Sequence, residues 1–158
     1  MGIEKDIQQN SFRNAFQKVM INVLYTHTWL AEHVKQFLAK EDITPQQYNI
    51  LRILRGSKEP LSTLQIRARM LDKMSDTSRI VDRMVSKQLV CKKANPLDKR
   101  LVDVTIAAQG LAVLERLDAI NHELDSVVSN QLSEQECEQL SSLLDKMRGN
   151  NTKRRLVS

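Results

Sequence analysis

The chain has 158 residues, of which 41% are hydrophobic and 27% are charged, enough apolar material for a packed core and too much for a disordered chain. Lys and Arg number 24 against 19 Asp and Glu, so the net charge is +5, which permits an anionic partner without requiring one. Four glycines and three prolines favour long helices over a many-turned sandwich or barrel.

Several classes of protein are excluded or disfavoured by simple patterns. Two cysteines, Cys91 and Cys137, exclude a disulfide scaffold and a four-cysteine zinc site. No run approaches the roughly 18 apolar residues of a membrane span. The first residues, with Glu4 and Asp6, lack the basic-then-apolar pattern of a signal peptide. We therefore expect a cytoplasmic protein with no membrane partner.

The charge is distributed unevenly along the chain. Residues 55–100 carry 12 basic and 5 acidic groups, whereas residues 111–145 carry 1 basic and 8 acidic groups. A strongly basic segment beside a strongly acidic one suggests a middle region that faces a nucleic acid, with the acidic part turned away. Ordinary solvated helix faces are the alternative interpretation of the same pattern.

Residues 10–40 are predicted to form one long helix. Its apolar residues recur mainly at spacings of three and four, with His27 on the stripe and with Tyr25 and Trp29 on a neighbouring face. A helix this apolar needs a large surface to bury against, and a dimer partner is one candidate. The stripe consists of Phe12, Phe16, Val19, Val23, Leu30, Val34 and Phe37, widened by Met20, Leu24, Ala31 and Leu38.

The next segment predicts a short helix between Thr44 and Gly56. Thr44 is a good cap, Pro45 suits the first helical position, and Gln47 completes a capping box. Gly56 is the type of residue expected just after the last turn.

Two further short helices follow. Residues 60–62 open the third, and after a connection at residues 72–74 we expect Ser75 to cap the fourth, with Asp76 in its first turn. Met70, Met74 and Met84 are predicted to be core residues. The fourth helix should bury Ile80, Val81, Met84 and Val85, and should expose Thr77, Ser78, Arg79, Asp82, Arg83, Ser86 and Lys87.

The periodicity then changes from helical to extended. Residues 89–93 and 101–106 predict two short strands, joined by a polar and basic turn at 94–100. Helical spacing returns after Gly110. Ser133 and Glu136 form another capping box that should start a last helix, which ends at residues 149–151.

The predicted fold is mainly α with a small β-hairpin wing: a winged helix-turn-helix flanked by long N-terminal and C-terminal helices. The start of a recognition helix enters the major groove of DNA, and a basic wing reaches the adjacent minor groove. Arg79 and Arg83 lie one turn apart on one face, while Asp82 pairs with a neighbouring cation or reads cytosine. The candidate DNA-binding residues are Ser75, Asp76, Thr77, Ser78, Arg79, Arg83, Lys92, Lys93, Lys99 and Arg100.

Residues 61–110 resemble the MarR (multiple antibiotic resistance regulator) family of bacterial winged helix-turn-helix regulators. The resemblance rests on the run 78–84, on residues 87–90, and on Asp98-Lys99-Arg100, which fits the D-x-R signature of the family's wing. There are two departures. Gln88 stands where the family often has Gly before the first wing strand, and Ala107 replaces a Thr that commonly caps the next helix.

This resemblance implies a homodimer that binds double-stranded DNA. It implies a dimerisation helix over 1–40, a DNA-binding lobe over 41–110, dimerisation helices over 111–150, and a basic tail over 151–158 that we expect to be disordered. By the same resemblance, Arg100 enters the minor groove and Asp98 orients it. Small anionic or phenolic effectors often bind between the dimer helices and the lobe in this family. Tyr25 and Trp29 are candidates for such a pocket, with core or dimer packing as the alternative.

The predicted function is a sequence-specific transcriptional regulator, a homodimeric repressor of a pseudo-palindromic operator that a small-molecule effector releases. The alternative is a helical protein-interaction dimer of the same fold without specific DNA binding. An enzyme is not expected, because the chain lacks the sequence motifs of phosphate-binding loops, nucleophile elbows and zinc proteases. The three histidines have no metal-ligand spacing, so neither a metal nor a cofactor is predicted. Cys137 is interpreted as a buried thiol, and the redox role of Cys91 is left open.

Overall fold

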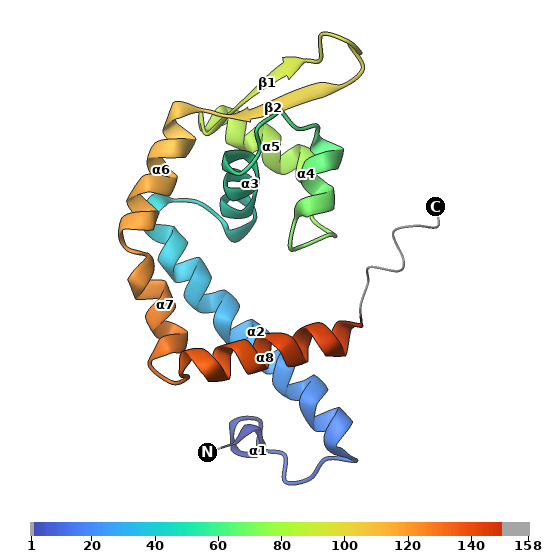
Figure 1. The fold of residues 1–158 in the computed structure, drawn as a ribbon, viewed down its shortest axis with the longest axis vertical. Coiled ribbons are helices and arrows are strands. Elements are labelled where there is room, and N and C mark those ends of the chain that lie inside the picture. The colour runs from blue at the N-terminus through green and yellow to red at the C-terminus, as the bar shows by residue number, and fades with distance from the viewer. Residues whose placement is uncertain (1, 150–158) are drawn as a thin grey trace. The chain divides into compact units, whose positions relative to one another are not determined.

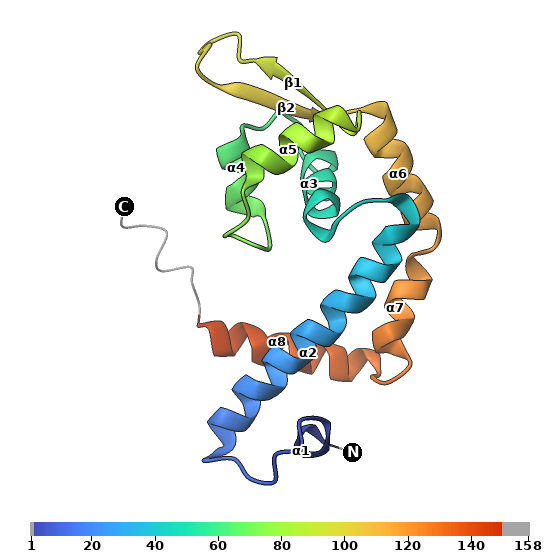
Figure 2. The same ribbon diagram turned by 180° about the vertical axis from the view of Figure 1, so that it is seen from behind.

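The structure is a computed structural model that describes residues 2–149 (Figures 1 and 2). The chain divides into two compact units, with the boundary between Ile120 and Asn121. The predicted fold class is confirmed: the chain is mostly helical, with one two-stranded antiparallel hairpin. The first unit contains α1 (Ile3–Asp6), α2 (Ala15–Leu38), the 3-10 helix η1 (Ala39–Glu41), α3 (Pro45–Arg55), α4 (Thr63–Arg69), α5 (Thr77–Ser86), β1 (Val90–Ala94), β2 (Val102–Ile106) and α6 (Ala108–Ala119).

The second unit contains α7 (Asn121–Ser129) and α8 (Glu134–Arg148). The predicted capping box is present: the Ser133 hydroxyl accepts from the Glu136 main-chain N–H, and the Glu136 carboxylate accepts from Ser133. Neither helix contains a buried residue. Cys137, predicted to be buried, is half-buried.

The long helix α2 begins five residues later than predicted. Asn14 is extended and its side chain accepts a hydrogen bond from the Gln17 main-chain N–H, so it caps the helix at residue 15. Only Phe37 and Leu38, in the last turn, are buried. Val23 and Val34 are half-buried, and much of the remaining stripe is open: Phe16 is 80% exposed and Leu24 is 66% exposed.

The core of the first unit lies among α3, α4, α5, α6 and the hairpin. The hairpin crosses one end of these helices (Figure 1). The predicted capping box of α3 is confirmed, with Thr44 and Gln47 bonded reciprocally, and Gly56 ends the helix. Side chains with at most 1% exposure include Leu38, Ile50, Leu51, Ile66, Met70, Val81, Met84, Val104, Leu114 and Leu117.

The strands of the hairpin pair in the register Val90↔Ile106 and Ala94↔Val102. Leu61 adds one more bridge: its N–H donates to the Val104 carbonyl and its carbonyl accepts from the Val104 N–H. This bridge joins the entry of α4 to the wing, so the hairpin is attached to the helices by main-chain hydrogen bonds as well as by buried side chains.

The base of the wing contains both departures noted in the sequence. Gln88 has φ of 61°, in the left-handed region that favours glycine. Ala107 starts α6 without a side-chain cap. That helix begins at Ala108, so the prediction that helical structure returns only after Gly110 is wrong. Gly110 sits in the first turn because a Cβ there would overlap the main-chain oxygen of Leu89.

Candidate nucleic-acid interface

The recognition helix α5 is anchored by one narrow apolar face. Val81 and Met84 are completely buried, and the helix packs on α3, α4 and β1. The predicted burial of Ile80 and Val85 is wrong, since Ile80 is half-buried and Val85 is 37% exposed. The anchored face is therefore narrower than predicted, and a wide polar face of α5 is left for a ligand.

The start of α5 differs from the prediction in three ways. Asp76, not Ser75, is the cap, because its carboxylate accepts from the Arg79 main-chain N–H while the Ser75 hydroxyl donates to the Asp72 carbonyl. Thr77 is only 4% exposed, so it faces inward and not toward a ligand. Met74, predicted in the core, is exposed on the preceding turn.

The polar face of α5 presents Ser78, Arg79, Asp82 and Arg83, all exposed. The Arg79 Nε lies 3.7 Å from the Asp76 carboxylate, a loose contact that leaves its guanidinium available. The Arg83 side chain makes no hydrogen bond or ion pair with any residue between 2 and 149. Two cations one turn apart on an exposed helix face suit guanine edges or phosphates.

Asp82 is already paired. The Lys92 ammonium donates to its carboxylate at 2.6 Å, linking the recognition helix to β1. This contact fits the interpretation that Asp82 pairs with a neighbouring cation. Lys92 and Lys93 alternate across the strand, so only one of the two is expected to face a phosphate, and this ion pair turns the Lys92 side chain toward α5. Lys93 is the next residue along the strand, and its side chain is exposed.

At the tip of the wing, Asp98 and Arg100 form a two-point ion pair. The Arg100 Nε and Nη2 donate to the two carboxylate oxygens at 3.1 and 3.3 Å, and the Arg100 main-chain N–H donates to Oδ1 at 3.0 Å. The Arg100 guanidinium, with its main-chain N–H, holds the pKa of the Asp98 carboxyl below its usual value. The Arg100 side chain is nevertheless 91% exposed. Asp98 thus fixes an arginine that solvent still reaches, and Lys99 is exposed between them.

Three cations that the sequence did not single out lie before α5. Arg67 and Arg69 end α4, and Lys73 follows in the turn; all three are exposed. The Arg67 Nε donates to the Lys73 carbonyl at 3.4 Å, and the Leu71 N–H donates to the Asn49 side chain of α3 at 2.9 Å. The count of basic residues in this segment was a signal for them, because the first helix of a helix-turn-helix crosses the DNA backbone.

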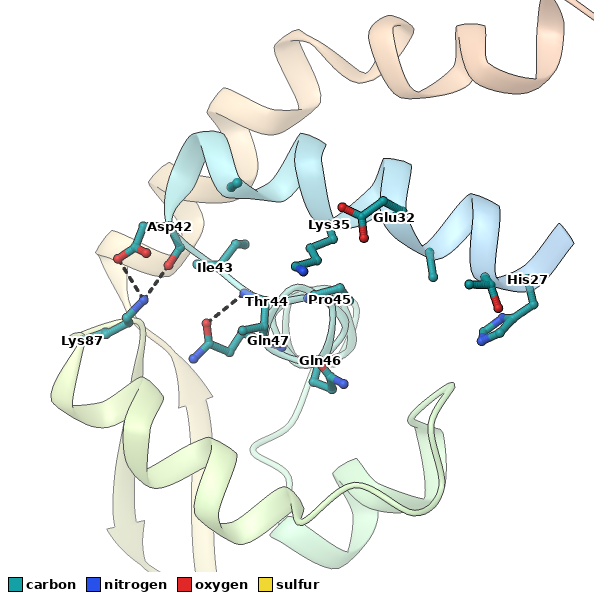
Figure 3. Close-up of a pocket in the computed structure, with 13 residues that line it drawn as sticks. His27, Glu32, Lys35, Asp42, Ile43, Thr44, Pro45, Gln46, Gln47 and Lys87 are labelled. Carbon is teal, nitrogen blue, oxygen red and sulfur yellow. Dashed lines mark hydrogen bonds and ion pairs between the residues drawn. The ribbon is translucent and has the colours of Figure 1, made fainter. Parts of the chain in front are cut away.

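A separate pocket of about 720 Å³ lies between α2 and the start of α3 (Figure 3). Glu32 and Lys35 point from α2 toward the start of α3, and His27 lies at the far end of the same wall. At the other end, the ammonium of Lys87, just after α5, donates to the Asp42 carbonyl and lies 3.1 Å from its carboxylate. His27, predicted on the apolar stripe, is exposed and lines this pocket.

The residues predicted for an effector pocket do not line this one. Tyr25 and Trp29 are each 43% exposed, on a neighbouring part of α2, and the Trp29 ring packs against the His33 ring at 4.6 Å. Sequence spacing alone could not separate these faces, because it says nothing of which part of α2 meets α3.

Residues 2–149 contain neither a candidate metal site nor a candidate membrane span. No three His, Cys, Asp or Glu side chains in this range are grouped in a way that could hold a metal ion. None of the helices in the same range has the length and apolar character needed to cross a bilayer. The basic tail at 151–158 lies outside the described residues.

Comparisons with known proteins agree with this geometry. The family model described as the MarR family matches residues 41–101. The transcriptional regulator MhqR of Bacillus subtilis is 26% identical over 82% of this chain and 89% of its own length. The transcriptional repressor IacR of Pseudomonas putida is 28% identical over 75% of this chain and 71% of its own length.

Solved structures show the same fold. A mutant MarR of E. coli in complex with operator DNA has a TM-score of 0.73 at 24% identity, covering 85% of this chain and 98% of that one. A MarR transcription factor of Planctomyces limnophilus has a TM-score of 0.65 at 26% identity, with 85% and 98% covered.

Proposed function

We propose that the protein is a homodimeric repressor that binds a specific operator and is released by a small anionic or phenolic effector. The proposal starts from the family: the chain belongs to the MarR family of transcriptional regulators and is not an enzyme. The observation that carries the DNA-binding part is the exposed but fixed wing arginine, Arg100, on the same lobe as a recognition helix with two exposed cations. The mutant E. coli MarR of the same fold is complexed with operator DNA, and IacR is named a repressor.

The lobe offers two sets of contacts suited to DNA. Ser78, Arg79 and Arg83 face outward from α5 and suit the edges and phosphates of a major groove. Arg100 and Lys99 project from the wing, and a narrow minor groove has the negative potential that favours an inserted arginine. Arg67, Arg69 and Lys73 add cations next to the recognition helix, suited to the phosphate backbone.

The homodimer is supported by the open apolar stripe of α2. Phe16, Met20 and Leu24 are at least half exposed in the single chain, and no residue of α7 or α8 is buried. Contiguous apolar surface of this kind marks an interface. Two copies would present two recognition helices, and a two-fold dimer reads half-sites about one helical turn, ~34 Å, apart.

The pocket beside α3 supports release by an effector. Lys35 and Lys87 offer two cations to a small acid, and Lys87 directly follows the recognition helix. An acid that paired with Lys87 would compete with Asp42 for the ammonium, and would thus shift the end of α5. The effector can only move the equilibrium by the difference between its affinities for the two arrangements.

The test of DNA binding is a titration of Arg100→Ala on a duplex that the wild-type protein selects from a random-sequence pool. We expect a loss of about 1–3 kcal/mol in binding, with a smaller salt dependence, since one charged contact is removed. The dimer should be intact by sedimentation. Unchanged affinity for the selected duplex would rule out the proposed role of the wing arginine.

The test of the effector site uses benzoate as a first small acid, with Lys87→Gln as the variant. We expect benzoate to weaken operator binding by the wild-type protein and to have less effect on the variant. Lys58→Gln is the matched control, because Lys58 is exposed in the same lobe but does not line the pocket. An equal response of wild type and Lys87→Gln would place release elsewhere.

A further inference from the structure

The side chain of Asn95, which is not among the proposed DNA contacts, holds the segment between the two wing strands. The Asn95 carbonyl Oδ1 accepts the main-chain N–H of Leu97 at 2.8 Å and that of Asp98 at 3.0 Å. Its amide Nδ2 donates to both carboxylate oxygens of Asp103, at 3.0 and 3.2 Å. Turning the amide over would set its donors against two N–H groups and its oxygen against a carboxylate, so only this orientation satisfies every group.

These bonds connect β2 to the wing arginine without a break. Asp103 holds Asn95, Asn95 holds the main chain at Asp98, and the Asp98 carboxylate holds Arg100 at two points. The main-chain bonds from Asn95 N–H to the Leu101 carbonyl and from Leu101 N–H to the Asp98 carbonyl close the same turn. Asn95 and Asp103 are half-buried, whereas Arg100 is almost fully exposed. The chain of hydrogen bonds therefore connects half-buried groups near β2 to an arginine in solvent.

We propose that Asn95 and Asp103 are positioning residues for DNA binding, which fix the wing tip so that Asp98 presents Arg100 to the minor groove before contact. This inference rests on the proposed function, because it assigns a role within the same DNA-binding site. An arginine has several free torsions, and ordering such a side chain at an interface costs conformational entropy. A tip that is already ordered reduces that cost on binding.

The strand register shows that the Asp103 carboxylate bonds the Asn95 amide in place of the cation opposite it. Asp103 lies opposite Lys93 in the strand register, the usual place for a cross-strand ion pair. No ion pair forms between Asp103 and Lys93. The carboxylate turns instead to the Asn95 amide, which leaves the Lys93 ammonium open to solvent. The acid of this strand therefore orders the tip and does not neutralise a cation.

The test measures binding of the duplex selected by wild type to four variants: Asn95→Ala, Arg100→Ala, the double variant, and Thr105→Ala. We expect Asn95→Ala to weaken binding about tenfold, and to change it by less than about twofold once Arg100 is already Ala, since the two act through one contact. Thr105 is exposed on the same strand and its side chain forms no bond with a described residue, so Thr105→Ala is the control and should bind like wild type.

A second measurement separates positioning from simple stability. Asn95→Asp sets two carboxylates side by side and should weaken binding, and the addition of Asp103→Asn should restore it, because an amide again faces a carboxylate. Thermal midpoints of all variants should stay close to that of wild type. Equal effects of Asn95→Ala with and without Arg100, or no effect in either, would overturn the inference. Failure of the wild-type protein to select any duplex would instead overturn the proposed function and this inference with it.

Discussion

The lobe formed by α3, α4, α5, the hairpin and α6 buries its apolar residues far more completely than helix α2 does. The lobe, from Ile43 to Leu117, completes its own core, with Ile50, Leu51 and Ile66 fully covered by one chain. Helix α2 buries only two residues of its last turn and leaves Phe16, Met20 and Leu24 at least half exposed. The lobe therefore completes its core within one chain, whereas the described residues leave much of the α2 stripe uncovered.

The same contrast extends to polar groups. Asp82, Asp98 and Asp103 in the lobe are each bonded to a neighbour within it. In the first six turns of α2, the described polar side chains bond mainly within the helix itself, as Thr28 and His33 do with main-chain carbonyls one turn earlier. The Asp82 pair thus joins α5 to β1, whereas these bonds of α2 stay within one helix and do not fix where it packs.

The largest effect is expected from breaking the core of the lobe. Leu51→Ala should lower the free energy of unfolding by about 2–5 kcal/mol, because it leaves a cavity in a fully buried site. Urea denaturation measures the loss. Leu64→Ala is the matched control, since Leu64 is 69% exposed in the same lobe, and it should change stability by less than about 0.5 kcal/mol. Equal losses would mean that the lobe's core is not where the structure has it.

The next effect concerns α2 and its missing partner. Leu24→Glu should leave the lobe folded but separate the dimer, because a charge on the stripe would be buried without a partner. Analytical ultracentrifugation and circular dichroism measure the two properties. Asn22→Glu is the control, because two residues along a helix place it roughly 200° away from Leu24. A Leu24→Glu protein that remained dimeric would exclude this stripe as the interface.

A smaller effect is expected where the wing joins the lobe. Gln88→Gly should raise the free energy of unfolding by about 1 kcal/mol, since glycine adopts the observed positive φ without the steric cost that a side chain carries there. Ser86→Gly, two residues earlier at the last position of α5, should instead lower it, because it removes the hydroxyl that donates to the Asp82 carbonyl and increases the backbone freedom of the unfolded chain. Thermal denaturation of both variants, compared with wild type, measures these changes. A Gln88→Gly variant less stable than wild type would contradict the strain assigned to this residue.

The smallest effect lies at the junction between α2 and the lobe. The Arg116 guanidinium of α6 donates to both carboxylate oxygens of Glu41 in η1, and these bonds hold the pKa of Glu41 below its usual value. Because the folded-state pKa is lowered, the ionised Glu41 stabilises the fold at pH values above the unfolded-state pKa of about 4.3. This contribution to the free energy of unfolding is lost as the pH falls through the folded-state pKa. Glu41→Gln should therefore lose less stability than wild type between pH 5 and pH 3, measured by urea denaturation. An identical pH profile would show that the pair contributes nothing.

The parts of this protein that depend on neighbouring residues were predictable from the sequence. The capping boxes at Thr44 and Ser133 involve side chains three positions apart, and both are present. Gln88 and Ala107 were flagged by comparison with a family pattern, and the backbone confirms the positive φ and the missing cap.

The parts that depend on distant residues were not predictable. The pairing of Asp82 with one particular cation, Lys92, depends on how α5 lies against β1, and the pocket depends on which side of α2 meets α3. Propensity and periodicity contain no term for such packing between elements. Thr77 is different: it lies four residues before Val81 and seven before Met84, so helical spacing places it on the buried face, and it is only 4% exposed.

The most direct test of the central claim is a titration of the purified protein against its selected duplex, at two salt concentrations, with random-sequence DNA as competitor. The account predicts saturable binding of a dimer that survives the competitor and weakens steeply with salt through counterion release. Binding that random DNA abolishes equally well would contradict it. That result would leave a basic surface without sequence specificity, and a helical interaction module in place of a repressor.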